Sequence, residues 1–332
     1  MGQRFNFVES SLTHNAEQLS GKAAYYWVRK SGAIEGVTWR DVRVRVDELS
    51  AALIDRGVGR GDRVMVGFRE CPELVCTMMA VLRIGAVAVP LTPMARAREL
   101  EHFQEHLKVR LIIGDSEAGA EFASLREHVD ILIYGETGSG LMRLDAEESP
   151  PPDTVSTLRS DPAVVFHTSG TTGAPKACLH RHSSLAAQAR LVARYNFEAS
   201  HSDVIFNVGP ATHAFGFMSK IGVPLHSGAA AMLFEELTPR NFRAALGEVR
   251  MTHLIGPTAA WKTTLHGDPT MDLSCVRYLE SLPYDIDEYG RLRAVGLRPV
   301  NPFGMAPMAG YFTTAGRGEP VGSVGAVLPG YE

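Results

Sequence analysis

The segment 168–176, TSGTTGAPK, combines four hydroxyl side chains, two glycines and a lysine between an apolar run and a predicted helix. Glycines let backbone N–H groups approach an anion, hydroxyl groups donate hydrogen bonds to phosphate oxygens, and an ammonium group supplies positive charge. We interpret the segment as a phosphate-binding loop, in preference to a polar turn that only joins two elements. The residues expected to contact phosphate are Thr168, Ser169, Gly170, Thr171, Thr172, Gly173 and Lys176.

The lysine of this segment is placed differently from the lysine of a P-loop. The pattern G-x-x-x-x-G-K-[ST] requires a lysine directly after the glycine, and then a hydroxyl residue that binds magnesium. Here Lys176 lies three residues after Gly173, and Ala177 follows it. The pattern therefore argues against a P-loop kinase or GTPase.

The elements that would position this loop follow an alternating pattern. Apolar runs at 23–28, 62–68, 86–91, 109–115 and 130–135 predict strands. Amphipathic segments at 41–56, 74–84 and 95–107 predict helices between them; the first places Val42, Val46, Leu49 and Leu53 on one face. Pro72 suits the start of the second helix. This alternation is typical of parallel β-α-β units.

The same rhythm returns in the second half, with strands expected at 163–168, 203–209, 229–235 and 252–256 and helices at 183–195, 215–225 and 238–249. The intervening segment 135–160 is rich in glycine, proline and polar residues, which marks a boundary. We therefore expect an α/β fold of two stacked, related subdomains with mainly parallel sheets, at 1–160 and 161–332. Ligands of such sheets bind beyond the carboxyl ends of the strands.

Composition restricts the class of protein. The net charge of −4 gives no reason to expect nucleic acid or an anionic membrane as a partner. No run of about 18 apolar residues is present, so no membrane span is expected. The four cysteines, Cys71, Cys76, Cys178 and Cys275, lack C-x-x-C spacing, which favours reduced thiols in a cytoplasmic protein. His180 and His182 lack further ligands at metal spacing, so we expect a solvated helix start there and no protein-held metal.

The phosphate loop resembles the signature loop of the adenylate-forming, or AMP-binding, superfamily. Segments 68–74 and 90–100 resemble the aryl- and acyl-CoA synthetase branch of that superfamily. Segments 36–66 and 81–115 resemble the family's opening segments, GPATHAFGF at 209–217 resembles its P-x-x-H-x-x-G segment, and 322–332 resembles the end of its second subdomain. The resemblance implies ATP-dependent activation of a small carboxylic acid to acyl-AMP. A thiol, from coenzyme A or an acyl-carrier protein, then displaces AMP. Magnesium would be carried by the nucleotide.

The resemblance also assigns residues. His213 and Lys176 would be catalytic, with His213 orienting the carboxylate and Lys176 holding phosphates. Phe303 and Gly304 would pack against adenine. The residues expected around the acid are His213, Phe215, Gly216, Phe217 and Met305, although both phenylalanines also fit a helix core. The phenylalanines favour an aromatic or medium-length acid.

The sequence departs from the family pattern in its later part. In the family's Y-G-x-T-E motif the threonine contacts the α-phosphate and the glutamate helps to hold magnesium; here Ala306 and Pro307 take those places. The family's small C-terminal domain is absent from this sequence. Three readings stay open: a truncated acid–thiol ligase, a catalytically degenerate relative that binds a nucleotide or an acyl group, and an interaction protein that reuses the fold.

Overall fold

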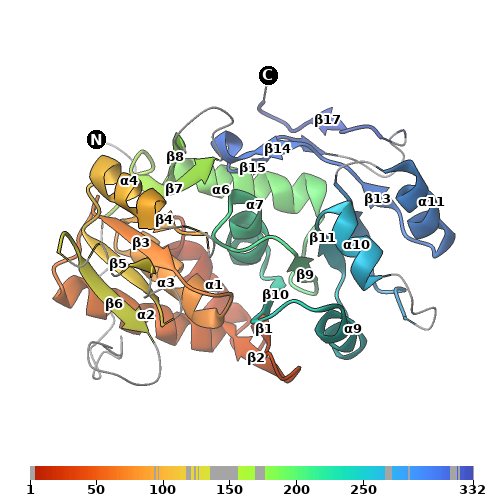
Figure 1. The fold of residues 1–332 in the computed structure, drawn as a ribbon, viewed down its shortest axis with the longest axis horizontal. Helices are drawn as coiled ribbons and strands as arrows, with labels where there is room; N and C mark the ends of the chain where they lie inside the picture. Colours follow the sequence, from red (N-terminus) through yellow and green to blue (C-terminus); the bar gives the residue numbers. More distant parts are fainter. Residues whose placement is uncertain are drawn as a thin grey trace. The chain divides into compact units, whose positions relative to one another are not determined.

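The computed structural model describes residues 4–92, 95, 97–116, 121–122, 125, 127–134, 156–168, 176–265, 271–282, 285–314, 320 and 322–331. Its contacts divide the chain into two compact units. Unit 1 comprises Met1–Gly21 and Trp39–Ala186, and unit 2 comprises Lys22–Thr38 and Ala187–Glu332. Each unit is built around one large sheet (Figure 1).

Unit 1 contains a six-stranded sheet in the order β6-β5-β3-β4-β7-β8. The strands are β3 (Arg63–Gly67), β4 (Val87–Pro90), β5 (Leu111–Asp115), β6 (Asp130–Tyr134), β7 (Pro162–Thr168) and β8 (Lys176–Arg181). The helices are α1 (Glu9–Gln18), α2 (Trp39–Asp55), α3 (Pro72–Arg83) and α4 (Ala97–Leu107), and α6 (His182–Leu191) begins in this unit. All neighbouring strands pair in parallel except β7 and β8, which form an antiparallel hairpin.

Unit 2 contains a seven-stranded sheet in the order β13-β12-β11-β9-β10-β1-β2. The strands are β1 (Ala23–Val28), β2 (Ile34–Thr38), β9 (Val204–Asn207), β10 (Ala230–Phe234), β11 (His253–Ile255), β12 (Tyr278–Glu280) and β13 (Pro299–Val300). The α-helices are α7 (Ala214–Phe217), α8 (Val223–Ser227), α9 (Pro239–Glu248), α10 (Thr258–Thr264) and α11 (Ile286–Ala294). Here too the pairs are parallel except for one hairpin, β1–β2, at the edge.

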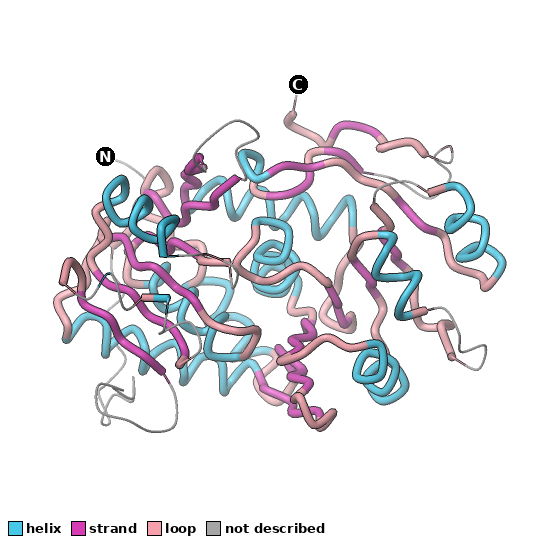
Figure 2. The backbone as a smooth tube through the Cα atoms, viewed as in Figure 1, coloured by secondary structure: helices cyan, strands magenta, loops and turns pink. Residues whose placement is uncertain are grey.

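Short elements complete unit 2. Two π-helical turns, Val192–Asn196 and Met218–Gly222, continue α6 and α7. Two small ribbons follow β13: β14 (Gly304–Met305) with β15 (Gly310–Tyr311), and β16 (Thr313–Thr314) with β17 (Ala326–Val327). A 3₁₀ turn, Ala306–Met308, joins the strands of the first ribbon. Figure 2 shows these ribbons as short strands separated by long loop segments.

The two sheets share one strand order. Numbering each sheet's strands from β3 or β9 gives the order 4-3-1-2 in both, as β6-β5-β3-β4 and as β12-β11-β9-β10. Each sheet then adds a parallel strand and an antiparallel edge strand, β7–β8 in unit 1 and β1–β2 in unit 2. The expectation of two related, mainly parallel α/β subdomains is therefore confirmed.

The helices pack on the sheets through the apolar faces that the sequence predicts. Val42, Val46, Leu49 and Leu53 of α2 are all buried, with at most 1% of each surface exposed. In unit 1, α4 packs on one face of the sheet through Leu100 and Phe103, and α3 lies on the other (Figure 1). In unit 2, α9, α10 and α11 form the core on one face of the sheet with Phe206 and Met232. Parallel sheets are commonly covered on both faces in this way.

The division of the chain differs from the expected boundary between residues 160 and 161. β7 pairs with β4, so the phosphate loop's hairpin belongs to unit 1, whereas the early hairpin β1–β2 pairs with β10 and belongs to unit 2. Sequence order does not reveal this exchange because strand pairing joins residues far apart in the chain. Within the described residues, no helix combines the length and the apolar character needed to cross a bilayer.

Candidate active site

Thr168 and Lys176, the first and last of the residues expected to bind phosphate, lie on the two strands of the β7–β8 hairpin. Thr168 ends β7, Lys176 begins β8, and the two lie opposite each other in the ladder. The Thr168 hydroxyl donates a hydrogen bond of 3.5 Å to the Lys176 carbonyl oxygen, and Lys176 is exposed. Ser169, Gly170, Thr171, Thr172 and Gly173 lie outside the described residues. The hairpin thus brings both ends of the candidate loop together.

The element after this loop is not the one expected. The sequence predicted that the loop leads into a helix, but β8 follows it, and α6 begins only at His182. Phosphate contacts at this place would therefore come from the loop backbone, the hydroxyls and Lys176, without the dipole of a helix that starts at the loop. β8 was not expected because most of its residues are exposed and its apolar residues do not alternate regularly with polar ones.

His180 and His182 are both buried, contrary to the expectation of a solvated helix start. His182 is fully buried, and its Nδ1 accepts a hydrogen bond of 3.1 Å from the Phe7 N–H group. Its burial lowers its pKa to about 4. His167 stacks on Phe103 with ring centroids 3.7 Å apart, and burial, helped by the nearby His102, lowers its pKa to about 4. The rings of His167 and His182 are therefore neutral at pH 7 and support the hairpin structurally.

The segment that carries His213 in unit 2 is held by a polar network. Asn207, at the end of β9, accepts the Gly209 N–H group at 2.7 Å and donates to the Ser219 hydroxyl at 2.7 Å. The buried Lys220 donates to the Gly209 carbonyl oxygen at 2.8 Å. These contacts fix the turn before His213, at the carboxyl end of a parallel strand, where ligands of such sheets bind.

His213 is the residue before α7, and its side chain is exposed. Its ring lies parallel to that of Phe215, with centroids 5.6 Å apart and planes at 8°. Desolvation by neighbouring atoms lowers the pKa of His213, so the imidazole is neutral at pH 7. A neutral, exposed imidazole can donate one N–H group to a carboxylate.

Gly216 and Phe217 take structural roles in this segment. A Cβ atom at Gly216 would lie 1.9 Å from the Pro210 carbonyl oxygen, so only glycine lets α7 approach the 209–210 turn this closely. Phe217 is fully buried and packs in the core of unit 2, so it offers no open surface to a ligand. Of the two phenylalanines, only the half-buried Phe215 remains beside His213.

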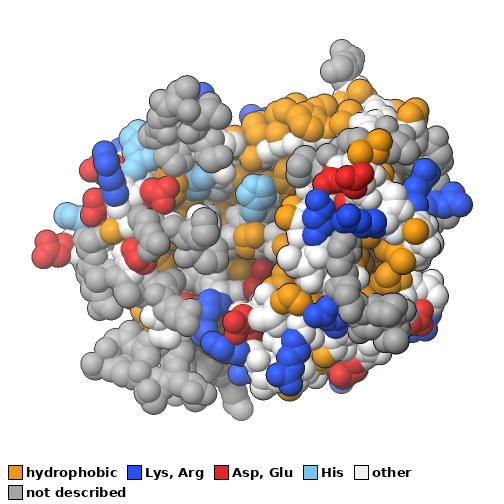
Figure 3. Space-filling view, turned by 45° about the vertical axis from the view of Figure 1, so that its right-hand side comes forward, with side chains coloured by type: hydrophobic (Ala, Val, Ile, Leu, Met, Phe, Trp, Pro, Cys, Tyr) orange, Lys and Arg blue, Asp and Glu red, His pale blue; other side chains and the backbone are white. Residues whose placement is uncertain are grey.

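Gly304 and Met305 form β14 of the β14–β15 ribbon, and Phe303 directly precedes it. Phe303 and Met305 are exposed, at 48% and 37%, and the Phe303 ring meets Phe312 edge-on at 5.3 Å. Gly304 must be glycine, because a Cβ atom there would lie 2.3 Å from the Gly310 carbonyl oxygen. Figure 3 shows hydrophobic side chains gathered along the edge of the molecule that carries the C-terminal strands.

Ala306 and Pro307 form the start of the 3₁₀ turn that follows β14. Ala306 is buried at 7% exposure, and Pro307 is exposed. Neither side chain has an oxygen atom, so this turn cannot coordinate magnesium through side chains. Within the described residues, no group of three His, Cys, Asp or Glu side chains is arranged to hold a metal ion.

Tyr311 on this ribbon and Glu280 on β12 form a buried pair that the sequence analysis did not anticipate. Tyr311 of β15 is fully buried, and its hydroxyl donates a hydrogen bond of 2.6 Å to Glu280 Oε2. Burial raises the pKa of Glu280 to about 8, although the Tyr311 hydrogen bond acts in the opposite direction. The sequence offered one indication of the buried glutamate: Glu280 is a charged residue beside the apolar residues of β12. Lys220, a lysine in an apolar helix, carried the same kind of signal.

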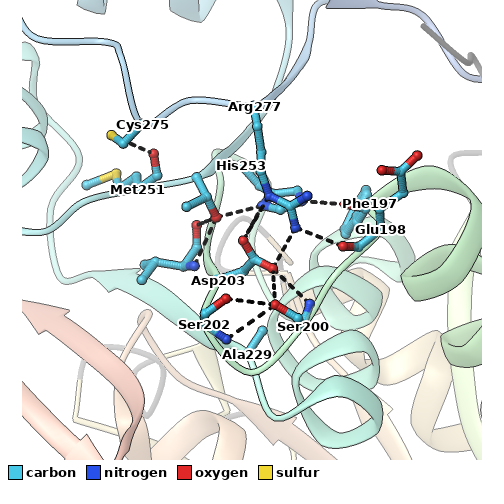
Figure 4. Close-up of polar contacts among 12 residues, drawn as sticks. Phe197, Glu198, Ser200, Ser202, Asp203, Ala229, Met251, His253, Cys275 and Arg277 are labelled. Carbon is cyan, nitrogen blue, oxygen red and sulfur yellow. Dashed lines mark hydrogen bonds and ion pairs between the residues drawn. The ribbon is translucent and has the colours of Figure 1, made fainter.

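A further polar cluster lies at the amino ends of the unit 2 strands (Figure 4). Arg277 donates to both carboxylate oxygens of Asp203, at 3.0 and 2.6 Å, and the Ser200 hydroxyl donates to Asp203 at 2.9 Å. Burial alone would raise the pKa of Asp203, but these hydrogen bonds lower it to about 2. His253 Nε2 binds the Phe197 carbonyl oxygen at 2.7 Å. Ser200 and His253 thus brace the fold and do not form a nucleophile–base pair.

The family model for AMP-binding enzymes matches residues 12–332. The chain belongs to the AMP-binding enzyme family. Its relatives include an uncharacterized acyl–CoA ligase, YtcI, of Bacillus subtilis, which is 30% identical over 68% of this chain and 44% of that protein. The acetyl-coenzyme A synthetase of Dictyostelium discoideum is 25% identical over 90% of this chain and 46% of that protein.

The solved structures agree with the AMP-binding fold. A benzoate CoA ligase from Burkholderia xenovorans LB400 superimposes with a TM-score of 0.85 at 22% identity, covering 99% of this chain and 67% of that one. This identity shows the fold alone. The chain spans less than half of the length of the two relatives named above.

Proposed function

We propose that this AMP-binding chain binds ATP and a small carboxylic acid and activates the acid as acyl-AMP. The observation that carries the proposal is the TSGTTGAPK segment, whose ends are joined by the β7–β8 hairpin with Lys176 exposed. Loop hydroxyls, backbone N–H groups and Lys176 would hold the β- and γ-phosphates. Phe303 and Gly304 would flank the adenine. Magnesium would arrive with the nucleotide, because the turn at Ala306 and Pro307 supplies no side-chain ligand.

The chemistry of activation requires positioning and charge neutralisation more than covalent help from the protein. The acid's carboxylate attacks the α-phosphate, and pyrophosphate leaves with the electron pair of the broken P–O bond. His213, neutral at pH 7, would donate an N–H group to the carboxylate and hold it for attack. In a second step a thiolate attacks the acyl carbonyl, and AMP leaves. Coenzyme A is the expected thiol, with an acyl-carrier protein as the alternative, in the cytoplasm.

ATP binding tests the loop directly. Lys176→Ala should weaken ATP binding measured by calorimetry by about 10- to 100-fold, because a charge-assisted hydrogen bond contributes about 1.5–3 kcal/mol. Arg181→Ala, at the other end of β8, is the matched control: it removes an exposed charge from the same strand and should leave the affinity unchanged. Equal affinities of the wild type and Lys176→Ala would remove this loop from the phosphate site.

A catalytically degenerate relative is the second candidate function, and Ala306 with Pro307 is the observation that favours it. If these residues limit turnover, acid-dependent pyrophosphate release should rise at least tenfold in an Ala306→Thr/Pro307→Glu variant, while ATP affinity changes less. Pro307 is exposed, so a glutamate can be accommodated there. Fast release by the unmodified chain would show that its own residues suffice. No release by either protein, with ATP still bound, would support the degenerate relative.

A further inference from the structure

A continuous line of side chains runs from the surface of unit 2 into its core. His213 is exposed and stacks on Phe215 at 5.6 Å. Phe215 meets the ring of Tyr311 edge-on, with centroids 5.0 Å apart and planes at 79°. The Tyr311 hydroxyl reaches Glu280 Oε2 at 2.6 Å. Aromatic centroids at such a distance are in direct contact, so no methylene group fits between Phe215 and Tyr311.

The inner end of this line is held firmly. Tyr311 is 0% exposed and Glu280 is 3% exposed, so neither side chain can turn to solvent without leaving the core. The backbone of each residue is also tied: Trp261 Nε1 donates to the Glu280 carbonyl oxygen at 2.6 Å, and the Gln188 side-chain amide donates to the Tyr311 carbonyl oxygen. The Tyr311 ring is therefore a fixed wall behind Phe215.

We propose that Tyr311, fixed by Glu280, closes the inner end of the acid site beside Phe215 and restricts the site to short carboxylic acids. This inference rests on the proposed function, which places the carboxylate at His213. From there, an acid tail that enters unit 2 runs along Phe215 and meets the Tyr311 ring after a few carbon atoms. This differs from the expectation that Phe215 and Phe217 mark a site for an aromatic or medium-length acid.

The hydrogen bond explains why a tyrosine and a glutamic acid occur together here. A buried carboxyl group is costly unless it is hydrogen-bonded, and a buried phenol likewise requires an acceptor. Each group satisfies the other, and the hydrogen bond keeps the Tyr311 ring against Phe215. Tyr278, two residues before Glu280 on β12, packs beside Phe197 at 5.0 Å, and Phe197 lies 6.0 Å from Tyr311. The rings of Phe197 and Tyr278 therefore also pack behind Tyr311.

The test compares acid preference in the full chain and two variants. Acetate, butyrate, hexanoate and benzoate are titrated by calorimetry in the presence of saturating ATP. Wild type should bind acetate and butyrate and bind hexanoate and benzoate at least tenfold more weakly. Tyr311→Ala should improve hexanoate and benzoate at least tenfold relative to acetate. Tyr311→Phe keeps the ring and loses only the hydroxyl, so it should retain the wild-type order; Tyr311→Val replaces the alanine variant if the latter fails to fold.

The outcomes separate this inference from the proposed function. Wild-type protein that prefers hexanoate or benzoate, or a Tyr311→Ala order that equals the wild-type order, overturns the inference while ATP and acid binding stand. If the acid tail runs outward past Met305, Tyr311→Ala should leave the order of acid affinities unchanged. Absence of binding by every acid overturns the proposed function and the inference together. Reordered binding in Tyr311→Ala but not in Tyr311→Phe supports the assignment of Tyr311 as the residue that limits acid size.

Discussion

Glu280 is a carboxylic acid that unit 2 keeps away from water, with a pKa of about 8. The folded protein binds this proton more tightly than the unfolded chain, in which an ordinary glutamate loses it near pH 4.3. The free energy of unfolding should therefore fall as pH rises from about 4.5 to about 8, by a few kcal/mol in total, and this contribution stays lost above pH 8. Urea unfolding between pH 5 and 9 measures the fall.

A Glu280→Gln variant provides the control for this pH dependence. Glutamine keeps an acceptor oxygen for the Tyr311 hydroxyl and does not ionise in this range. The difference in unfolding free energy between wild type and variant should thus shrink or reverse as pH rises, since only the wild type must either hold a proton or bury a charge. A difference that stays constant from pH 5 to pH 9 would contradict the raised pKa.

At the residue scale, the sequence singles out residues with distinctive neighbours and gives no sign of those whose partners are distant in the chain. His213 and Lys176 stand out because glycines and hydroxyls surround them in the sequence. Tyr311 and Glu280 are joined by a side-chain hydrogen bond between residues 31 positions apart, and the sequence around either residue does not indicate this pairing. Phe217 was expected near the acid but is fully buried. A phenylalanine on a helix has the same spacing in the sequence whether it faces a ligand or the core, so the sequence alone does not distinguish the two.

The helix α9 shows how one side chain contributes to an element. Thr238 precedes the helix in extended geometry, and its hydroxyl accepts the Asn241 N–H group at 3.1 Å. This bond satisfies one of the N–H groups that the first turn leaves unpaired. Thr238→Ala should therefore lower the free energy of unfolding by about 1 kcal/mol. Thr238→Ser retains the hydroxyl and should cost clearly less in the same urea titration; equal losses would mean that the cap is unimportant.

At the element scale, the helices and strands with regularly spaced apolar residues were the ones that the sequence predicted. The helix α2 and the strands β3, β4 and β5 were expected because apolar residues recur at the spacing that each element requires. β8 was not, because its strand conformation depends on pairing with β7 and not on its own mostly exposed residues. The π-helical turns at 192–196 and 218–222 could not be predicted either, because their residues fit the pattern of a continuous α-helix equally well.

At the scale of the whole molecule, the hairpin β1–β2 links the beginning of the chain to unit 2. Val28 pairs with Phe234 and Tyr25 with Ala231. Replacing Lys22–Thr38 by a glycine-serine segment of equal length would leave β10 as an unpaired edge strand. Hydrogen exchange of the β10 amides that face β1 should accelerate strongly, because open edges exchange without unfolding of the core. Amides of β3 in unit 1 should keep their wild-type protection.

The same replacement distinguishes two ways in which the units can depend on each other. If unit 1 is a separate cooperative body, its protection stays intact while unit 2 weakens. If amides of β3 and β10 lose protection together, the units unfold as one, and their division by contacts has no energetic counterpart. Unit 1 contains its own sheet and core cluster, which supports the first result.

The exchange of hairpins between units also affects how the chain is made on the ribosome. Ala231 follows its pairing partner Tyr25 by 206 residues. At a synthesis rate of about 5–20 residues per second, the nascent hairpin emerges about 10–40 s before the strand it must join. During that interval the whole of unit 1 can fold, while the hairpin waits with unpaired backbone groups. Unit 2 therefore completes its sheet only late in translation, and premature pairing of β1 or β2 with another nascent chain is the characteristic hazard of this topology.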